Sequence, residues 1–81
     1  MNVRSLEAAD LARVLAIEAA SFPDPWNEEL FRQELGRSDR VWRVGTDEGS
    51  VVAYGGVMIV GDEAHLMDLA VDPAHRERGI A

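Results

Sequence analysis

The sequence predicts an α+β fold in which two helices pack on an antiparallel sheet, and three observations lead to that prediction. Residues 7–22 and 27–35 carry helical signals, whereas residues 40–44, 51–60 and 64–71 read as strands. These three strands follow one another with only short turns between them, which favours an antiparallel meander. At 81 residues, of which 47% are hydrophobic, the chain is at most one domain and is too apolar to be disordered.

The first two elements are a short strand over residues 2–6, NVRSL, and a helix over residues 7–22, EAADLARVLAIEAASF. Apolar residues recur near helical spacing in the second stretch, namely Leu11, Val14, Leu15 and Phe22, with Ala8, Ala12 and Ala19 beside them. Alanine and leucine also favour the helix intrinsically, so this is the most secure helix of the chain.

A second, shorter helix is expected over NEELFRQEL, because the preceding PDPW restricts the backbone twice and forces a turn. Asn27 is a good N-cap residue. Trp26 and Phe31 then occupy the two ends of a hydrophobic staple. Gly36 is the natural end of this helix.

The remainder of the chain reads as three strands and their turns. RVWRV alternates, GTDEGS over residues 45–50 is a turn, and VVAYGGVMIV is β-branched and apolar. Gly55-Gly56 in the middle of that strand indicates a bulge or a close backbone approach. GDE turns the chain again, and AHLMDLAV is the last strand. The predicted order is therefore β-α-α-β-β-β, followed by the start of a third helix.

Composition excludes several classes of function. The net charge is −7, from 15 acidic and 8 basic residues, and such an acidic chain is a poor candidate for binding nucleic acid. The absence of cysteine leaves no disulfide framework and no thiolate chemistry. The N-terminus has no signal-peptide pattern and no stretch is long enough to span a membrane, so we expect a soluble, cytoplasmic protein. His65 and His75 lack a convincing partner spacing, so we expect no metal site.

The stretch MDLAVDPAHRERGIA predicts an anion site. A strand ends at Val71, Pro73 forces the chain out of it, and Gly79 opens a helix. The first N–H groups of a helix have no partner within it and carry the positive end of its dipole, which suits a pyrophosphate. Arg76 and Arg78 add positive charge beside that turn. The simpler alternative is an ordinary turn glycine with two solvated arginines.

The strand before the turn supplies a second element of this site. If Leu69 to Val71 are bulged or lie at an open edge, their N–H and C=O groups are available to an extended ligand that contains amides. Phosphates at a helix start beside an amide-bearing arm on a strand edge describe coenzyme A.

The same residues carry a resemblance to a known family. Arg76 to Ala81, RERGIA, resembles the signature of the GCN5-related N-acetyltransferases (GNAT): Arg or Gln, two residues, Gly, one residue, then Gly or Ala. LAVDP directly before it resembles the usual end of that family's fourth strand. Ile17-Glu18 and Pro25-Trp26 also resemble the first two helices of RimI-type ribosomal-protein alanine N-acetyltransferases.

The resemblance implies acetyl-CoA as cofactor and a set of backbone contacts to it. The implied cofactor-binding residues are Leu69, Ala70 and Val71 for the acetyl and pantetheine part, and Arg76, Glu77, Arg78, Gly79, Ile80 and Ala81 around the pyrophosphate.

The resemblance also implies that residues 1–81 are the N-terminal half of a GNAT domain whose C-terminal half is absent. In RimI-type enzymes the glutamate proposed as general base and the tyrosine proposed as general acid lie beyond the Gly-x-Ala turn, so no position here corresponds to either. We therefore name no catalytic residue, assign neither Tyr54 nor Glu18 to those roles, and expect no efficient turnover from this chain alone.

Two functions are carried forward. The first is transfer of acetyl from acetyl-CoA to a primary amine, with the N-terminal alanine of a ribosomal protein as the favoured acceptor and small-molecule amines and lysine side chains as alternatives. The second is a non-catalytic acyl-CoA-binding or protein-interaction module, completed by a partner or by self-association through the unfinished sheet edge. Neither involves a nucleic acid or a membrane as partner.

Overall fold

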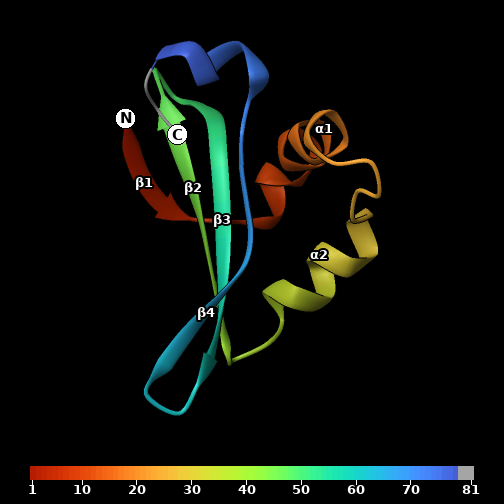
Figure 1. The fold of residues 1–81 in the computed structure, drawn as a ribbon, viewed down its shortest axis with the longest axis vertical. Coiled ribbons are helices and arrows are strands. Elements are labelled where there is room, and N and C mark those ends of the chain that lie inside the picture. The colour runs from red at the N-terminus through yellow and green to blue at the C-terminus, as the bar shows by residue number, and fades with distance from the viewer. Residues whose placement is uncertain (79–81) are drawn as a thin grey trace.

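A computed structural model describes residues 1–78, in which two helices lie across one face of a four-stranded antiparallel sheet (Figure 1). The strands are β1 (Asn2–Ser5), β2 (Arg40–Asp47), β3 (Ser50–Val60) and β4 (Glu63–Val71), and they lie side by side in that order. The helices are α1 (Leu11–Ser21) and α2 (Glu28–Leu35), and the short 3-10 segments are η1 (Ala8–Asp10) and η2 (Pro73–Arg78). The predicted α+β class and the order of elements from β1 to β4 are confirmed.

The first predicted helix is present, but its start and its buried face differ from the prediction. Residues 8–10 form a 3-10 turn instead of α-helix, and the Asp10 carboxylate there accepts hydrogen bonds from the Glu7 N–H and the Arg4 guanidinium, both at 2.8 Å. The alanines expected beside the apolar stripe, Ala8, Ala12 and Ala19, are exposed. The stripe is instead completed by two residues that the prediction left out of it, Ile17 and Glu18.

The second helix begins and ends as predicted. The Asn27 Oδ1 atom accepts a hydrogen bond from the Leu30 N–H at 2.9 Å, which caps the start of α2. The rings of Trp26 and Phe31 lie 5.3 Å apart, so the predicted staple is formed. Gly36 ends the helix in the right-handed conformation, so its lack of a side chain is not required there.

The turns between the strands are tighter than predicted. The stretch expected as a turn over residues 45–50 contributes Gly45, Thr46 and Asp47 to β2, and the chain reverses over two residues only, Glu48 and Gly49, whose φ angles are 52° and 84°. Positive φ at both central residues matches the right-handed twist of the strands that the turn joins. Glu63, also expected in a turn, is the first residue of β4.

A bulge interrupts the sheet beside Gly55-Gly56, as predicted. Gly56 pairs with Asp68 and Val57 pairs with Leu66, so the extra residue is Met67 on β4. The close approach is also present, because a Cβ atom on Gly56 would lie 2.4 Å from the ring carbons of Trp42. The bulge therefore bends β4 near its centre, shortly before the strand reaches Leu69.

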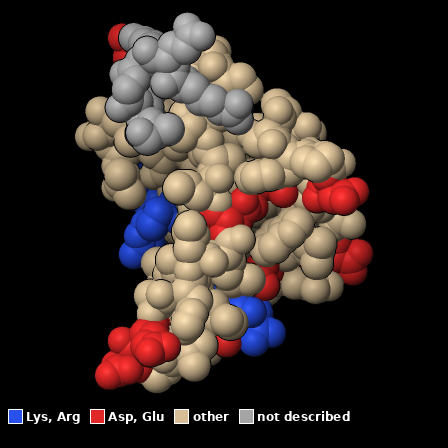
Figure 2. Space-filling view, viewed as in Figure 1, with Lys and Arg blue, Asp and Glu red and all other residues tan. Residues whose placement is uncertain are grey.

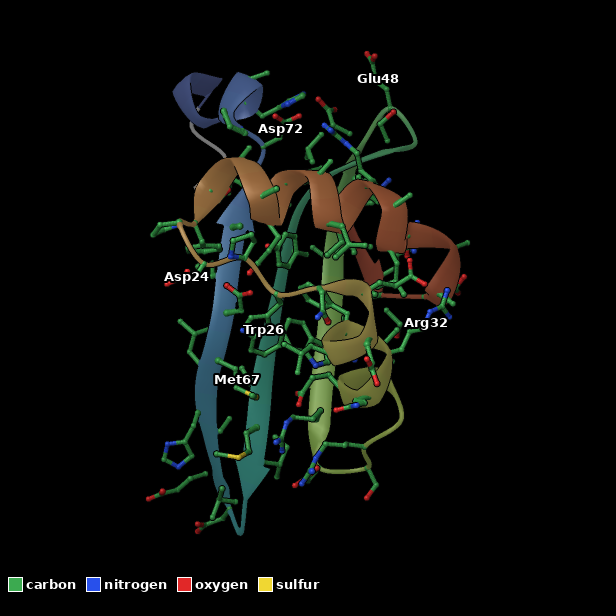
Figure 3. All side chains as sticks on the ribbon, turned by 90° about the vertical axis from the view of Figure 1, so that its right-hand side faces the viewer. Asp24, Trp26, Arg32, Glu48, Met67 and Asp72 are labelled. Atoms are coloured by element: carbon green, nitrogen blue, oxygen red, sulfur yellow. The ribbon has the colours of Figure 1, made fainter. Side chains whose placement is uncertain are left out.

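The two faces of the sheet differ in what covers them. The face under the helices forms the core, where Trp42, Val44, Tyr54 and Ala70 pack with Phe31. On the opposite face, Val3, Leu66 and Leu69 are 66%, 67% and 61% exposed. Figure 3 shows α1 and α2 in front of the core face of the sheet.

The described surface is acidic at several places. Figure 2 shows acidic side chains at the tip of the β3–β4 hairpin and along the helical side of the molecule, with few basic ones between them. Among residues 1–78, no helix combines the length and the apolar character that crossing a bilayer requires.

Candidate functional site

The edge of β4 is the first part of the candidate site. Among the described strands β4 pairs with β3 alone, and the Asp72 N–H donates to the Val52 carbonyl at 2.7 Å. Since antiparallel pairs alternate, Leu69 and Val71 turn their N–H and C=O groups away from β3, whereas Ala70 faces its partner Tyr54. Among the described strands, β4 is therefore an edge strand in the segment of Leu69 to Val71.

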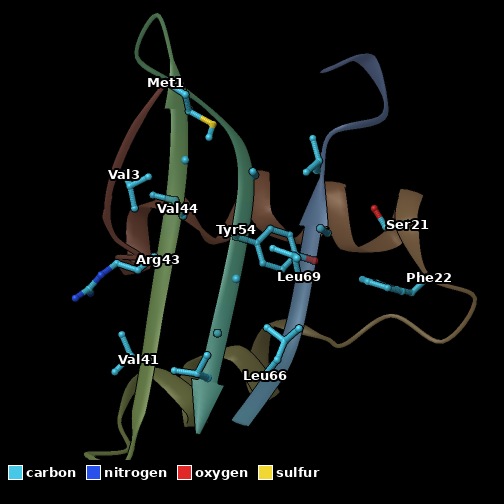
Figure 4. A pocket seen from close by; sticks show the side chains of 17 residues that line it. Met1, Val3, Ser21, Phe22, Val41, Arg43, Val44, Tyr54, Leu66 and Leu69 are labelled. Carbon is cyan, nitrogen blue, oxygen red and sulfur yellow. The ribbon is translucent and has the colours of Figure 1, made fainter. Parts of the chain in front are cut away.

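A hollow of about 720 Å³ adjoins this edge on the face away from the helices (Figure 4). Its described lining is mainly apolar, with Val41, Val57, Leu66 and Leu69 among the contributors and Arg43 as its charged side chain. Ser21 and Phe22 extend the lining around β4 to the end of α1. An apolar wall next to outward-facing peptide groups suits an elongated ligand made of methylenes and amides, such as a pantetheine arm.

Asp72 fixes the direction in which the chain leaves β4. Its Oδ1 atom accepts a hydrogen bond from the Ala74 N–H at 3.1 Å, and its carbonyl accepts one from the His75 N–H at 2.8 Å. Its Oδ2 atom pairs with the Arg13 guanidinium, while the Arg13 Nε–H donates to the Val51 carbonyl at 3.0 Å. The Ala74 N–H first, and then Arg13, hold the pKa of the Asp72 carboxyl below its usual range. Helix α1 is thus tied to the turn that follows β4.

The expected phosphate turn is described only in part. Arg76, Glu77 and Arg78 belong to η2, so a 3-10 segment intervenes between Pro73 and the expected helix start. Gly79, Ile80 and Ala81 lie outside the described residues.

A buried hydrogen-bond network beneath β4 was not anticipated from the sequence. The Tyr54 hydroxyl donates to Oε1 of Glu18, and the Trp26 N–H donates to Oε2 of Glu18 at 3.0 Å. Tyr54 and Glu18 are only 1% and 2% exposed. Burial first, and then the bond to Glu18, raise the pKa of Tyr54. One carboxylate therefore joins α1 to β3 and to the segment that leads into α2.

Asp68 extends this network to β4. Its Oδ1 atom accepts a hydrogen bond from the Leu69 N–H at 2.9 Å, whereas its Oδ2 atom is buried without a partner among the described residues. Burial first, and then the neighbouring Glu18 carboxyl, raise the pKa of Asp68 to about 7. The signal in the sequence was slight: Asp68 lies two residues before Ala70, so it shares the core-facing side of the strand.

Neither histidine belongs to a metal-binding cluster among the residues that the structure describes. His65 is exposed and its Nε2 lies 3.1 Å from a Glu63 carboxylate oxygen, and the His75 Nδ1 lies 3.4 Å from Asp72 Oδ2. Within the part of the chain that the structure describes, no three His, Cys, Asp or Glu residues are grouped so that they could hold a metal ion.

Comparison with known proteins gives consistent similarities. The model of the Acetyltransferase (GNAT) family matches residues 11–81. The [Ribosomal protein bS18]-alanine N-acetyltransferase of Escherichia coli (strain K12) is 32% identical over 79 residues, which are 98% of this chain and 53% of the relative. The crystal structure of the ribosomal-protein-S18-alanine N-acetyltransferase from Escherichia coli superposes with a TM-score of 0.86 at 30% identity, over 98% of this chain and 50% of that one.

A more distant structure shares the fold. The PaiA N-acetyltransferase from Thermoplasma acidophilum in complex with coenzyme A gives a TM-score of 0.82 at 16% identity, over 98% of this chain and 63% of that one. The chain spans about half the length of the curated relatives it matches.

Proposed function

The chain belongs to the GNAT family of acetyltransferases, and from that premise we propose that it forms the acetyl-CoA-binding half of an N-acetyltransferase. The observation that carries the proposal is the outward-facing edge of β4 at Leu69 and Val71, next to an apolar hollow and followed directly by the turn at Asp72. A strand edge offers peptide groups to the amides of pantetheine, and the hollow offers an apolar wall to its methylenes.

In this proposal the donor runs along β4 and ends at the turn. Leu69, Ala70 and Val71 contact the acetyl and pantetheine part through their backbone. Arg76, Glu77, Arg78, Gly79, Ile80 and Ala81 surround the pyrophosphate. Acetyl-CoA, when bound, supplies an activated acetyl thioester. Helix α1 supports the arrangement, because Arg13 holds the carboxylate that shapes the turn.

The acceptor we propose is a primary amine, and specifically the N-terminal alanine of a ribosomal protein, after the relatives of this chain. A ribosomal acceptor implies a cytoplasmic location. Transfer requires a deprotonated amine next to the thioester and a proton for the leaving thiolate. We propose that residues 1–81 are a partial domain that lacks the groups for these proton transfers, so that they bind the donor without efficient turnover.

Thermal unfolding with and without ligand tests the donor site. We expect acetyl-CoA to raise the melting temperature in a concentration-dependent way that free acetate does not reproduce. Acetyl-CoA at roughly 100 times its Kd should add about 2.7 kcal/mol to the free energy of unfolding. No shift in a folded sample would contradict the proposal. Incubation with an alanine-starting peptide tests turnover separately, and rapid acetylation would contradict the claim that further residues are required.

A second candidate function is favoured by the exposed face and edge of the sheet. Leu66 and Leu69 are 67% and 61% exposed on a nine-residue edge strand, and such edges recruit other chains. In this alternative the chain is a binding module that a partner or a second copy completes. A concentration-dependent increase in molecular mass by sedimentation, without any effect of acetyl-CoA on stability, would favour it over the enzyme.

A further inference from the structure

The Leu69 N–H is an outward-facing donor of the β4 edge, and a side chain occupies it. Its partner is the Asp68 Oδ1 atom at 2.9 Å, not a backbone carbonyl. A side-chain acceptor can leave by a change of rotamer, whereas a strand-to-strand bond breaks only when the sheet opens. The donor is therefore occupied but exchangeable.

The second oxygen of the Asp68 carboxylate, Oδ2, has no hydrogen-bond donor among the described residues, unlike Oδ1. Asp68 Oδ2 is buried, and the Glu18 carboxyl is its titratable neighbour. Two ionised carboxylates have no hydrogen to share, so the contact is repulsive until one of them is protonated. A proton on Asp68 then creates an O–H that Glu18 can accept. Oδ2 has almost no contact with solvent, so water does not take the place of that hydrogen bond.

The surroundings of the two carboxylate oxygens of Asp68 thus shift its pKa in opposite directions. The bond from the Leu69 N–H favours the carboxylate, and the burial next to Glu18 favours the acid. Removal of the Leu69 bond leaves only the second influence. A ligand that takes the Leu69 N–H should therefore drive Asp68 to its protonated form.

We propose that Asp68 is a positioning residue of the donor site: it holds the Leu69 N–H in the free chain, yields it to the carbonyl oxygen of an acyl thioester, and takes up a proton from solvent toward Glu18. The inference rests on the proposed function, because it needs an acyl-CoA along β4. Its consequence is that donor binding is linked to proton uptake near neutral pH and to a tighter connection between β4 and α1.

Within the part of the chain that the structure describes, the titratable groups around this proton come from α1 and β3. On α1 the facing group is Glu18, which is held by the Trp26 N–H from the segment before α2 and by the Tyr54 hydroxyl from β3. The acidic residue of that segment, Asp24, is exposed. Among the described residues, Glu18 is therefore the titratable partner that raises the pKa of Asp68, and Tyr54 acts on Asp68 only through its bond to Glu18.

Isothermal titration calorimetry in two buffers of different ionisation enthalpy, both at about pH 7, measures the proton uptake. Acetyl-CoA is compared with CoA, which carries the same phosphates but no acyl carbonyl. A carboxyl group with a pKa of about 7 is half protonated at this pH, so acetyl-CoA should take up about half a proton more than CoA. Asp68→Asn should abolish this difference. Asp62→Asn, the same change at an exposed residue of the β3–β4 turn, should retain it.

The outcomes separate this inference from the function on which it rests. Binding of both ligands with equal proton uptake would overturn the role of Asp68 and leave the donor site standing. Absence of binding by either ligand would overturn the donor site and the inference with it. A carboxyl ¹³C titration of the free chain adds a test that needs no ligand: Asp68 should titrate near neutrality, and titration in the ordinary range near pH 4 would overturn the shared proton.

Discussion

The Tyr54 hydroxyl on β3 donates a hydrogen bond to the Glu18 carboxylate on α1, 36 residues earlier in the chain. Both side chains are almost entirely buried, and the same carboxylate accepts the Trp26 N–H. A buried carboxylate is stable only when its oxygens are paired, so these two donors allow a charge to lie under the sheet. The helix layer is thereby attached to the sheet at one polar point within an apolar core.

Removal of the Tyr54 hydroxyl should destabilise the fold. Tyr54→Phe keeps the ring against Phe31 but leaves one buried carboxylate oxygen of Glu18 without its donor. We expect the free energy of unfolding to fall by about 2–3 kcal/mol, as for a hydrogen bond to a charged group. Urea unfolding measures the loss. The double variant Tyr54→Phe with Glu18→Gln is the matched test, because a neutral amide should recover part of the stability. Equal stability of Tyr54→Phe and wild type would contradict the network.

Asp68 should make the fold more stable in acid than at neutral pH. Its pKa is raised in the folded state, so the native chain binds the proton more tightly than the unfolded chain. This contribution is fully present below the ordinary aspartate pKa of about 4 and is lost as the pH rises through about 7. Urea midpoints measured from mild acid to above neutrality should therefore decline for wild type relative to Asp68→Asn.

The difference between wild type and Asp68→Asn removes the pH dependence that other carboxylates contribute. The paired carboxylates Asp10 and Asp72 have lowered pKa values, so their contribution is present above about pH 4 and is lost only in stronger acid. Both proteins share it, and the difference between their curves isolates Asp68. Parallel curves over the whole range would show that Asp68 titrates normally.

Gly56 is required by the position of a ring. A Cβ atom there would lie 2.4 Å from carbons of Trp42, which is itself held between Trp26 and Phe31. Gly56→Ala should therefore cost at least about 1–3 kcal/mol, the usual range for overpacking. Gly36→Ala is the control, because its nearest neighbour would lie at 3.5 Å and its φ is negative. Thermal unfolding should give a lower melting temperature for Gly56→Ala than for Gly36→Ala. An unchanged melting temperature of Gly56→Ala would show that the Trp42 ring does not lie against Gly56.

Much of this fold can be predicted from the sequence, because the signals that specify it are local. The Asn27 cap, the Trp26–Phe31 staple and the β-branched run of β3 each lie within a few residues, and all three are present. The length of the turn predicted over residues 45–50 was too great, because non-local contacts decide where the strands end. Gly45 and Thr46 lie in a polar, glycine-containing stretch, but they pair with β3 on one side and with β1 on the other, and the contacts with β1 are distant in sequence.

The candidate site also contains one part that local sequence signals predict and one part that depends on non-local packing. The edge at Leu69 to Val71 follows from the order of strands and could be predicted. The meeting of Glu18 with Tyr54 and Asp68 could not, because a glutamate within an alanine-rich helix looks like a solvated residue until the sheet covers it. Its burial depends on the angle at which α1 crosses β3 and β4, and no short pattern encodes that angle.

The Asn27 cap offers the most local prediction. Asn27→Ala removes the acceptor for the Leu30 N–H at the start of an eight-residue helix, and such a cap is worth about 1 kcal/mol. Because α2 holds Phe31 against Trp42, fraying of its first turn should also loosen the aromatic cluster, so the near-ultraviolet circular dichroism should weaken before global unfolding. Asn27→Ser keeps an acceptor at the same position and should restore both signals. If Asn27→Ala and Asn27→Ser behaved alike, the side-chain oxygen would not be what stabilises the helix, and the staple alone would account for where α2 begins.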